Sequence, residues 1–343
     1  MTPSYKRIAA EEAFAPPEIL DHYRALLNDG ADHDPGFASL CGFYLNNASP
    51  RIQEVISRMT DLGDLRINDM DSTGIARQIL SLTAPGVQIF DAPLAVSLAR
   101  ESNDYLAAGI RHHPDRFSGL AAIAPQNPSA AARELERGVQ HLGLRGAIVN
   151  SHTRGEYLDD EKFWPIFEAA EALDVPVYIH PSYLPNAIIQ PFLDRGLDGA
   201  IYGFAVETGL HILRIILAGV FDRFPRLRIV IGHLGEGLPY WLFRIDFMHA
   251  RMVAANRYAT VRKLRRKPSD YIRQNIWITT SGTAWEPPIL YAQSVLGVDR
   301  VLYAMDYPYQ FVPEEVAVTD NLPIPDADKM KLYQTNAEVV FKL

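Results

Sequence analysis

Short apolar runs recur along the chain, and each is followed by polar residues and then by a longer segment with helical spacing. Near-continuous apolar runs of this length are typical of parallel strands that are buried on both faces. The segments between them are long enough to form crossover helices. The eight candidate strands cover residues 7–14, 78–85, 117–125, 145–152, 175–181, 228–236, 276–282 and 301–308.

Three of the intervening helices can be read from the pattern, over residues 129–142, 160–173 and 208–223. In the first, Ser129 is a candidate N-cap and Gly143 follows the expected end. The second carries apolar residues at helical spacing, and the third is unusually apolar. Strands and helices therefore alternate over most of the chain.

This alternation predicts an α/β fold, a (β/α)8 barrel of the TIM type whose strands tilt and close so that no edge is left unpaired. A doubly wound open sheet is the alternative. Neither G-x-G-x-x-G nor G-x-x-x-x-G-K-[ST] opens a helix after a strand, so the usual phosphate-binding signatures of open sheets are missing. No repeat or Gly/Ser linker divides the chain, and we expect one domain over residues 1–343.

Two segments are longer than a minimal barrel needs. Residues 15–67 follow the first strand, and residues 182–207 follow the fifth. Long strand-to-helix segments usually lie over the mouth of a barrel, where ligands bind. We therefore expect both to be active-site insertions that form walls for a substrate.

Composition excludes several classes of function. The formal net charge of -8 argues against nucleic-acid binding, and the basic run at 262–268 is too short to reverse that expectation. The single Cys41 cannot form an internal disulfide, and the N-terminus lacks the layout of a secretory signal. No apolar run approaches the roughly 20 residues that cross a bilayer. The expected location is the cytoplasm, without a membrane role.

Polar residues stand at the ends of the candidate strands. In a barrel the carboxyl ends of the strands face one shared pocket. Each residue alone has a simpler explanation, since a threonine or serine can cap a helix, an asparagine can close a turn, and a single histidine is commonly a core residue. The strand-end residues are Glu11, Thr83, Asn150, His180, His233, Ser281 and Asp306.

Two histidines and two acids at four strand ends favour a metal site over isolated structural residues. A carboxylate in a barrel mouth is costly unless a cation is near, and Glu11, His180 and Asp306 would bring a divalent ion to formal neutrality. Three protein ligands leave positions open for water or substrate. Ligand chemistry alone does not choose between manganese, magnesium and zinc.

Seven motifs carry a resemblance to a known family: IAAEEAF, INDMDSTGI, VYIHP, GFAVETGLH, IGHLGEGLPYWLFRID, ITTSG and AMDYPYQ. Together they resemble the metal-dependent decarboxylase branch of the amidohydrolase superfamily, from about Ile8 to the C-terminus. The resemblance implies a distorted (β/α)8 barrel that holds one divalent metal, with Mn²⁺ as the expected ion, through Glu11, His180 and Asp306. It also implies a homo-oligomer, a dimer or larger.

The resemblance extends to the activity and the substrate pocket. It implies His233 beside the metal, and it implies substrate contacts from Arg51, Thr83, Arg244 and Tyr309. The expected reaction is the nonoxidative decarboxylation of a hydroxylated aromatic carboxylate met in lignin breakdown. The expected substrate is 5-carboxyvanillate, which would give vanillate and CO2.

One difference separates the chain from the hydrolases of the superfamily. Their first strand carries His-x-His, whereas Glu11 and Ala13 occupy those places here. Replacing two imidazoles by one carboxylate argues against a hydrolytic site. Two alternatives remain open: a hydrolase or lactonase in which Asp306 activates a metal-bound water, and a catalytically silent barrel that acts as a scaffold and binds no metal.

A mechanism follows from the expected site. Loss of CO2 directly from an aryl carbon would leave a localised carbanion, so the ring carbon should be protonated first. Asp306 is the candidate acid, and His233 would orient or relay its proton. Arg51 and Arg244 offer planar forks for carboxylates, although Arg51 could be a solvated loop residue and Arg244 could pair with a neighbouring acid on its helix. Nearby aromatic residues that would suit a flat ring are Phe43, Tyr44, Tyr307 and Tyr309.

Overall fold

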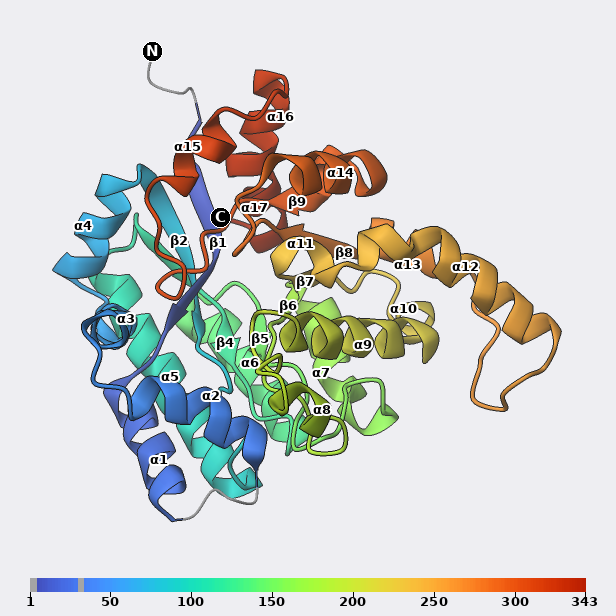
Figure 1. The fold of residues 1–343 in the computed structure, drawn as a ribbon, viewed down its shortest axis with the longest axis horizontal. Helices are drawn as coiled ribbons and strands as arrows, with labels where there is room; N and C mark the ends of the chain where they lie inside the picture. Colours follow the sequence, from blue (N-terminus) through green and yellow to red (C-terminus); the bar gives the residue numbers. More distant parts are fainter. Residues whose placement is uncertain (1–4, 30–33) are drawn as a thin grey trace.

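The computed structural model describes residues 5–29 and 34–343. Its strands pair in parallel within two sheets, of orders β1-β2-β3 and β4-β5-β6-β7-β8-β9 (Figure 1). Each of the eight predicted apolar runs contains or overlaps a strand, which confirms the alternating pattern. The strands are β1 (Arg7–Phe14), β2 (Ile75–Leu82), β3 (Phe117–Gly119), β4 (Ala121–Ala122), β5 (Ala147–Val149), β6 (Val177–Ile179), β7 (Ile229–Ile231), β8 (Ile276–Thr279) and β9 (Val301–Leu302).

The two sheets join into a closed barrel at both seams. At one seam β3 and β4 form one run, in which the Leu120 N–H donates to the Leu80 carbonyl at 2.9 Å and the next N–H donates to Gly146 at 2.8 Å. At the other seam β1 lies beside the segment that follows β9, and the Ala10 N–H donates to the Tyr303 carbonyl at 2.9 Å. The predicted TIM-type barrel is therefore present, and the doubly wound open sheet is excluded.

Helices surround the barrel and fill the longer connections. Those between β1 and β2 lie together on one side in Figure 1, whereas α12 extends away from the body of the molecule. The helices are α1 (Pro17–Asn28), α2 (Pro35–Leu45), α3 (Pro50–Thr60), α4 (Asp64–Ser72), α5 (Ala92–His112), α6 (Pro128–Leu142), α7 (Trp164–Leu173), α8 (Gln190–Leu193), α9 (Gly203–Leu217), α10 (Val220–Arg223), α11 (His233–Glu236), α12 (Leu238–Ala254), α13 (Pro268–Asn275), α14 (Glu286–Leu296), α15 (Glu315–Asp320), α16 (Asp326–Met330) and α17 (Asn336–Phe341).

The helix predictions are correct in place and wrong in detail. Asn127, not Ser129, caps α6, because its side chain accepts the Ala130 N–H and Pro128 takes the first helical position. Gly143 follows the helix with φ +73°, as expected of a C-terminal glycine.

The other two predicted helices have different bounds. The segment 160–173 begins with a 3₁₀ turn at Glu161–Phe163 before α7 starts. The segment 208–223 is split between α9 and α10, because Gly219 adopts φ +81° and interrupts the helix.

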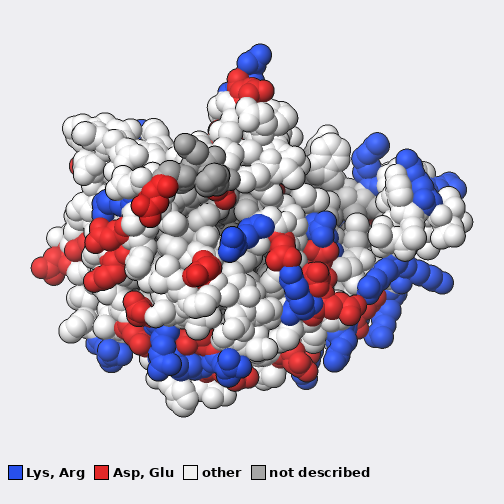
Figure 2. Space-filling view, turned by 90° about the horizontal axis from the view of Figure 1, so that it is seen from below, with Lys and Arg blue, Asp and Glu red and all other residues white. Residues whose placement is uncertain are grey.

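Charge is distributed unevenly over the surface. Lys and Arg side chains gather at the end of the molecule toward which α12 extends (Figure 2). The basic run 262–268 follows α12 in the chain and its charged side chains are exposed, which agrees with a solvated segment. No helix of the described residues is long and apolar enough to cross a membrane.

Candidate metal centre

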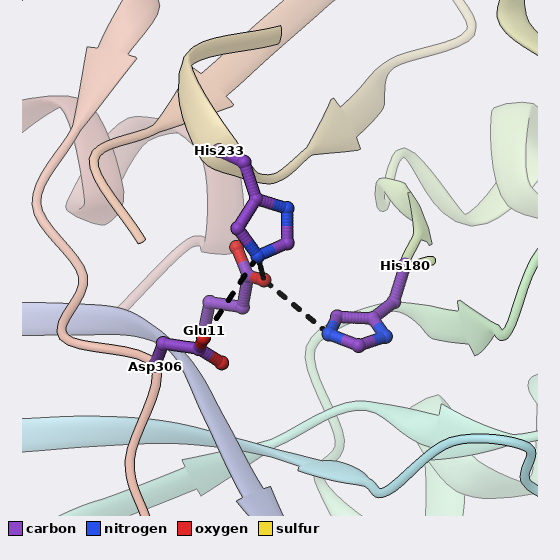
Figure 3. A group of neighbouring side chains, drawn as sticks. All are labelled: Glu11, His180, His233 and Asp306. Atoms are coloured by element: carbon purple, nitrogen blue, oxygen red, sulfur yellow. Dashed lines mark ion pairs between the residues drawn. The ribbon is translucent and has the colours of Figure 1, made fainter. Parts of the chain in front are cut away.

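Four side chains, one from β1 and three from the segments after β6, β7 and β9, converge at the mouth of the barrel (Figure 3). Glu11 comes from β1, and His180, His233 and Asp306 follow β6, β7 and β9. One ligand atom from each lies within 4.8 Å of the others. The Glu11 Oε1 is 3.4 Å from the His180 Nε2 and 3.5 Å from the His233 Nε2, and the His233 Nε2 is 3.9 Å from the Asp306 Oδ2.

The backbone near the cluster adopts conformations that turn these side chains inward. His233 and Asp306 have φ +48° and +71°, a region that L-residues rarely occupy. Gly232 leaves room for the acid from β1, since a Cβ atom there would lie 2.7 Å from the Glu11 carboxylate oxygens. The local turns, rather than regular strand geometry, therefore give the cluster its shape.

Glu11 is only 3% exposed, and its two oxygens have different surroundings. Oε2 accepts hydrogen bonds from the Tyr178 hydroxyl and, at 2.6 Å, from the Thr279 hydroxyl. Oε1 has no hydrogen-bond partner among the described residues, and it faces the two imidazoles. A buried carboxylate oxygen without a donor is costly, so the Glu11 Oε1 fits a cation held together with neighbouring ligand atoms of the cluster.

His180 presents a free nitrogen to the cluster. Its Nδ1 lies 2.8 Å from the Pro181 carbonyl, which can only accept, so Nδ1 carries the proton. Burial lowers the pKa of His180, although Glu11 opposes this shift. The neutral ring therefore directs the Nε2 lone pair toward Glu11, as a metal ligand requires.

His233 is paired with an acid that the sequence patterns did not single out as its partner. The His233 Nδ1 lies 2.7 Å from the Glu236 Oε1. Burial lowers the pKa of His233, but Glu236 and then Glu11 outweigh it and raise the pKa to about 10. The spacing His-x-x-Glu after a strand was the available signal. Its meaning depends on the left-handed turn 233–236, which periodicity does not encode.

Asp306 has an unusual proton affinity. Burial raises the pKa of this carboxyl to about 7, against the opposing effect of His233 and with a further rise from Glu11. A carboxyl of this kind can hold a proton close to neutral pH. The arrangement can therefore supply both a ligand oxygen and an acid at the same place.

A cavity of about 520 Å³ opens onto the cluster. This size suits a single substituted ring, and ligand cavities are commonly lined by aromatic side chains with a few polar groups. Residues of α2, the loop after β6 and the start of α9 contribute to its wall. The lining includes Phe43, Tyr44, Tyr183, Phe204 and Tyr309 beside His180, His233 and Asp306.

Thr83 and Tyr309 meet beside the cavity. Their hydroxyls are hydrogen-bonded to each other, and the Tyr44 ring packs edge-on against Tyr309 with centroids 5.1 Å apart. Tyr309 lines the main cavity, whereas Thr83 lines a smaller adjoining one. The structure thus brings these two predicted substrate contacts together near the metal centre.

The two predicted arginines lie outside the cavity lining. Arg51 is exposed at the start of α3, although it is close enough to Tyr44 to oppose the pKa rise that burial and Asp306 cause there. Arg244 is exposed on α12 and has no ion pair among the described residues. The acids that could have paired with it are engaged elsewhere, since Glu236 binds His233 and Asp246 accepts hydrogen bonds from Ser269.

Three other candidate residues point elsewhere. Tyr307 is buried, and its hydroxyl donates to Asp69 at 2.9 Å, so it does not line the cavity as expected. Asn150 is buried and donates to the Leu82 carbonyl at 3.3 Å. Ser281 is also buried, outside the cavity lining.

Known proteins resemble the chain over nearly its whole length. A family model described as amidohydrolase matches residues 64–343. The gamma-resorcylate decarboxylase of Polaromonas sp. strain JS666 is 39% identical over 298 residues, 84% of this chain and 90% of that protein. The chain therefore belongs to the amidohydrolase superfamily, and within it to the metal-dependent decarboxylases. It is a lyase by relationship, which confirms the expected class.

Two solved structures are especially similar. The 5-carboxyvanillate decarboxylase of Novosphingobium aromaticivorans, complexed with manganese and 4-hydroxy-3-methoxy-5-nitrobenzoic acid, is 50% identical with a TM-score of 0.97, covering 99% of this chain and 97% of that one. The 5-carboxyvanillate decarboxylase of Sphingomonas paucimobilis is 40% identical with a TM-score of 0.93, covering 99% and 100%. The expected cofactor, a divalent ion such as Mn²⁺, agrees with the first of these and with the four-residue cluster.

Proposed function

We propose that the chain catalyses the nonoxidative decarboxylation of a hydroxylated aromatic carboxylate of the kind released from lignin, with 5-carboxyvanillate as substrate and vanillate and CO2 as products. One observation carries this proposal: a buried, unpartnered oxygen of Glu11 faces two imidazoles and Asp306 beneath a cavity with aromatic walls. The names of the two similar structures support the choice of substrate.

Three side chains would hold the metal: Glu11, His180 and Asp306, with Mn²⁺ as the expected ion. When bound, a divalent ion supplies a Lewis acid for the phenol and the adjacent carboxylate of the substrate and stabilises negative charge on the phenolic oxygen.

Asp306 would move the proton. Its carboxyl takes the phenolic proton and delivers it to the ring carbon that bears the carboxylate, forming a C–H bond. The C–CO2 bond then breaks, and its electron pair returns to the ring as aromaticity is restored. Without a bound ion, burial raises the pKa of Asp306 to about 7. A metal ion held by this carboxyl would lower that pKa, so the ion and the proton compete for the same group.

His233 would keep this acid in position. Glu236 binds its Nδ1 and favours the imidazolium, so that Nε2–H faces Asp306 and Glu11. A positive charge at this place favours the ionised form of Asp306 after proton transfer. His233 therefore serves as an orienting and relaying group.

The long connections would shape the substrate pocket. We propose that segments 15–67 and 182–207 are active-site insertions, and residues of both line the cavity. Thr83 and Tyr309 would contact the substrate from one side. Arg51 would act from the cavity edge as a positive partner for its second carboxylate.

Arg244 raises the question of assembly. It is exposed on α12 together with aromatic side chains, including Tyr240 and Phe243, which are 72% and 82% exposed. Exposed aromatic clusters mark interaction surfaces. We propose a homo-oligomer, a dimer or larger, in which a neighbouring copy covers α12, and Arg244 would reach a substrate only in such an assembly. If light scattering at micromolar concentration shows a monomer, this assembly is contradicted.

Each copy would be one domain, 1–343, in the cytoplasm.

A direct assay tests the reaction. Purified protein with added Mn²⁺ would be offered 5-carboxyvanillate, other hydroxybenzoates and lactones, with the phenol followed by absorbance and CO2 by a coupled assay. We expect release of vanillate, with the Asp306→Asn variant folded and slower by about 10²- to 10⁴-fold. Turnover of a lactone without CO2 release would favour the hydrolase alternative, and full activity of Asp306→Asn would remove Asp306 as the acid.

A further inference from the structure

The residue next to the candidate metal ligand on β1 points to the other side of the strand. Successive side chains of a strand alternate between its two faces, so Glu12 turns away from the cluster that Glu11 joins. Glu12 is 0% exposed. Its Oε1 accepts the Met305 N–H at 3.0 Å, and its Oε2 accepts the Tyr307 N–H at 3.1 Å.

The residue between these two N–H groups is Asp306. Its φ of +71° lies in the left-handed region, which residues other than glycine rarely occupy. A single carboxylate thus grips the backbone on both sides of the residue with the unusual conformation. The Gln310 N–H donates to the Asp306 carbonyl at 2.9 Å and closes the turn on its far side.

The buried guanidinium of Arg66 lies close enough to Glu12 to oppose the rise in its pKa that burial causes. Arg66, also 0% exposed, donates to the carbonyl of Ala13 at 2.9 Å, and its guanidinium lies 4.5 Å from the centroid of the Tyr307 ring. The Tyr307 hydroxyl donates to Asp69. The two strands at this barrel seam are therefore fixed to each other by buried polar contacts rather than by strand pairing alone.

We propose that Glu12 is a positioning residue for Asp306: it fixes the backbone turn that aims the Asp306 carboxylate at the metal centre. This rests on the proposed role of Asp306 as ligand and acid. The outer partners of metal ligands orient them, and losing such a partner typically costs about 10- to 100-fold in metal affinity or activity. Here the partner acts on the ligand's backbone instead of its side chain.

The test compares Mn²⁺ affinity, read from the electron paramagnetic resonance signal of free Mn²⁺, with kcat and KM. For Glu12→Ala we expect a Kd for Mn²⁺ raised about 10- to 100-fold and a kcat lowered to a similar extent, with a KM within about threefold of the wild-type value. Glu12→Gln keeps one acceptor oxygen, so its Kd for Mn²⁺ and its kcat should lie between those of the wild type and those of Glu12→Ala. Metal affinity is a readout that does not depend on which substrate the enzyme uses.

Asn103→Ala is the matched control. Asn103 is 0% exposed and also binds barrel backbone through both side-chain atoms, donating to the Ala122 carbonyl at 2.9 Å and accepting the Ala122 N–H at 2.7 Å. This variant should lose stability yet bind Mn²⁺ as the wild type does. If folded Glu12→Ala behaves like Asn103→Ala, the positioning role is wrong.

Two further outcomes are decisive. If Glu12→Ala does not fold, the nearly isosteric Glu12→Gln decides by the same comparison with Asn103→Ala. Asp306→Ala separates the two proposals, because wild-type Mn²⁺ affinity in that variant would remove Asp306 as a ligand. Weak Mn²⁺ binding by Asp306→Ala together with normal binding by both Glu12 variants would reject the positioning role alone.

Discussion

The two faces of β1 bury their carboxylates in different ways. On the outer face both oxygens of Glu12 accept backbone N–H groups, and the buried guanidinium of Arg66 lies behind them. On the inner face one oxygen of Glu11 accepts two hydroxyls, and the other meets only imidazole and carboxylate groups within the described residues.

This difference separates a structural acid from a binding acid. A buried carboxylate whose lone pairs are satisfied by the protein holds elements together. One that faces other ligand atoms without a donor keeps a strong affinity for a cation. Glu11 and Glu12 are adjacent in sequence and chemically identical, so their surroundings alone give them different roles.

The largest expected effect comes from neutralising the inner acid. Glu11→Gln keeps an oxygen for the Tyr178 and Thr279 hydroxyls but removes the charge that faces the imidazoles. Because an outer partner of a metal ligand is worth about 10- to 100-fold, a ligand itself should be worth more than about 100-fold in Mn²⁺ affinity and kcat. Titration with Mn²⁺ and steady-state kinetics measure both. Wild-type Mn²⁺ binding by this variant would erase the contrast between the two faces.

A smaller effect, on stability, is expected on the outer face. Arg66→Met removes a buried guanidinium that donates to the carbonyls of Asp61 and Ala13, and it leaves Glu12 without its positive neighbour. We expect the free energy of unfolding to fall by about 1–3 kcal/mol for each buried carbonyl left without a donor. Urea unfolding followed by circular dichroism measures it.

Arg58→Met is the control for that change. Arg58 pairs with Asp69 in the same region, but its side chain is 20% exposed. A partly solvated pair of this kind contributes about 1 kcal/mol or less. If Arg66→Met and Arg58→Met lose the same free energy of unfolding, burial does not explain the contribution of Arg66 to stability.

The two faces of β1 also show which parts of the fold and the site could be predicted from the sequence. Strand ends of a parallel barrel meet by topology, so an acid at 306 and histidines at 180 and 233 could be brought together from their positions alone. The fold class and the composition of the cluster were accessible for the same reason. Glu11 was predicted from its place on the first strand, and the family resemblance implied the same residue; register, which decides whether Glu11 or Glu12 faces inward, was not weighed.

Other features depend on geometry that no hydrophobic period encodes. The left-handed turns at 233–236 and 306 decide that Glu236 binds His233 and that Tyr307 points away from the cavity. Helix starts shift by a residue or two when a proline takes the first position, as at Asn127. Arg244 was assigned to the pocket by resemblance, and within one copy of the chain it is exposed on α12.

A third buried acid extends the comparison. Glu207 on α9 is 0% exposed and lies close to Glu236, the acid that binds His233. Burial raises its pKa to about 8, although contacts with Ser151 and Tyr157 oppose the rise. This acid therefore favours its protonated form at neutral pH, as burial also does for Glu12, whose pKa is raised to about 8 despite its two backbone donors.

The smallest expected effect is that of Glu207→Gln on the free energy of unfolding at acidic pH. The difference between this variant and the wild type should change as the pH rises. The unfolded chain releases this proton near pH 4.5 and the folded chain near pH 8, so the unfolded state binds fewer protons in between and wild-type stability falls across that window. The variant lacks this contribution, and its curve of unfolding free energy against pH should be flatter by up to about 1.4 kcal/mol per pH unit. Urea titrations from pH 5 to pH 8 measure both curves. Parallel curves would show that Glu207 is ionised in the fold, and that its contacts with Ser151, His152 and Tyr157 outweigh the effect of burial on its pKa.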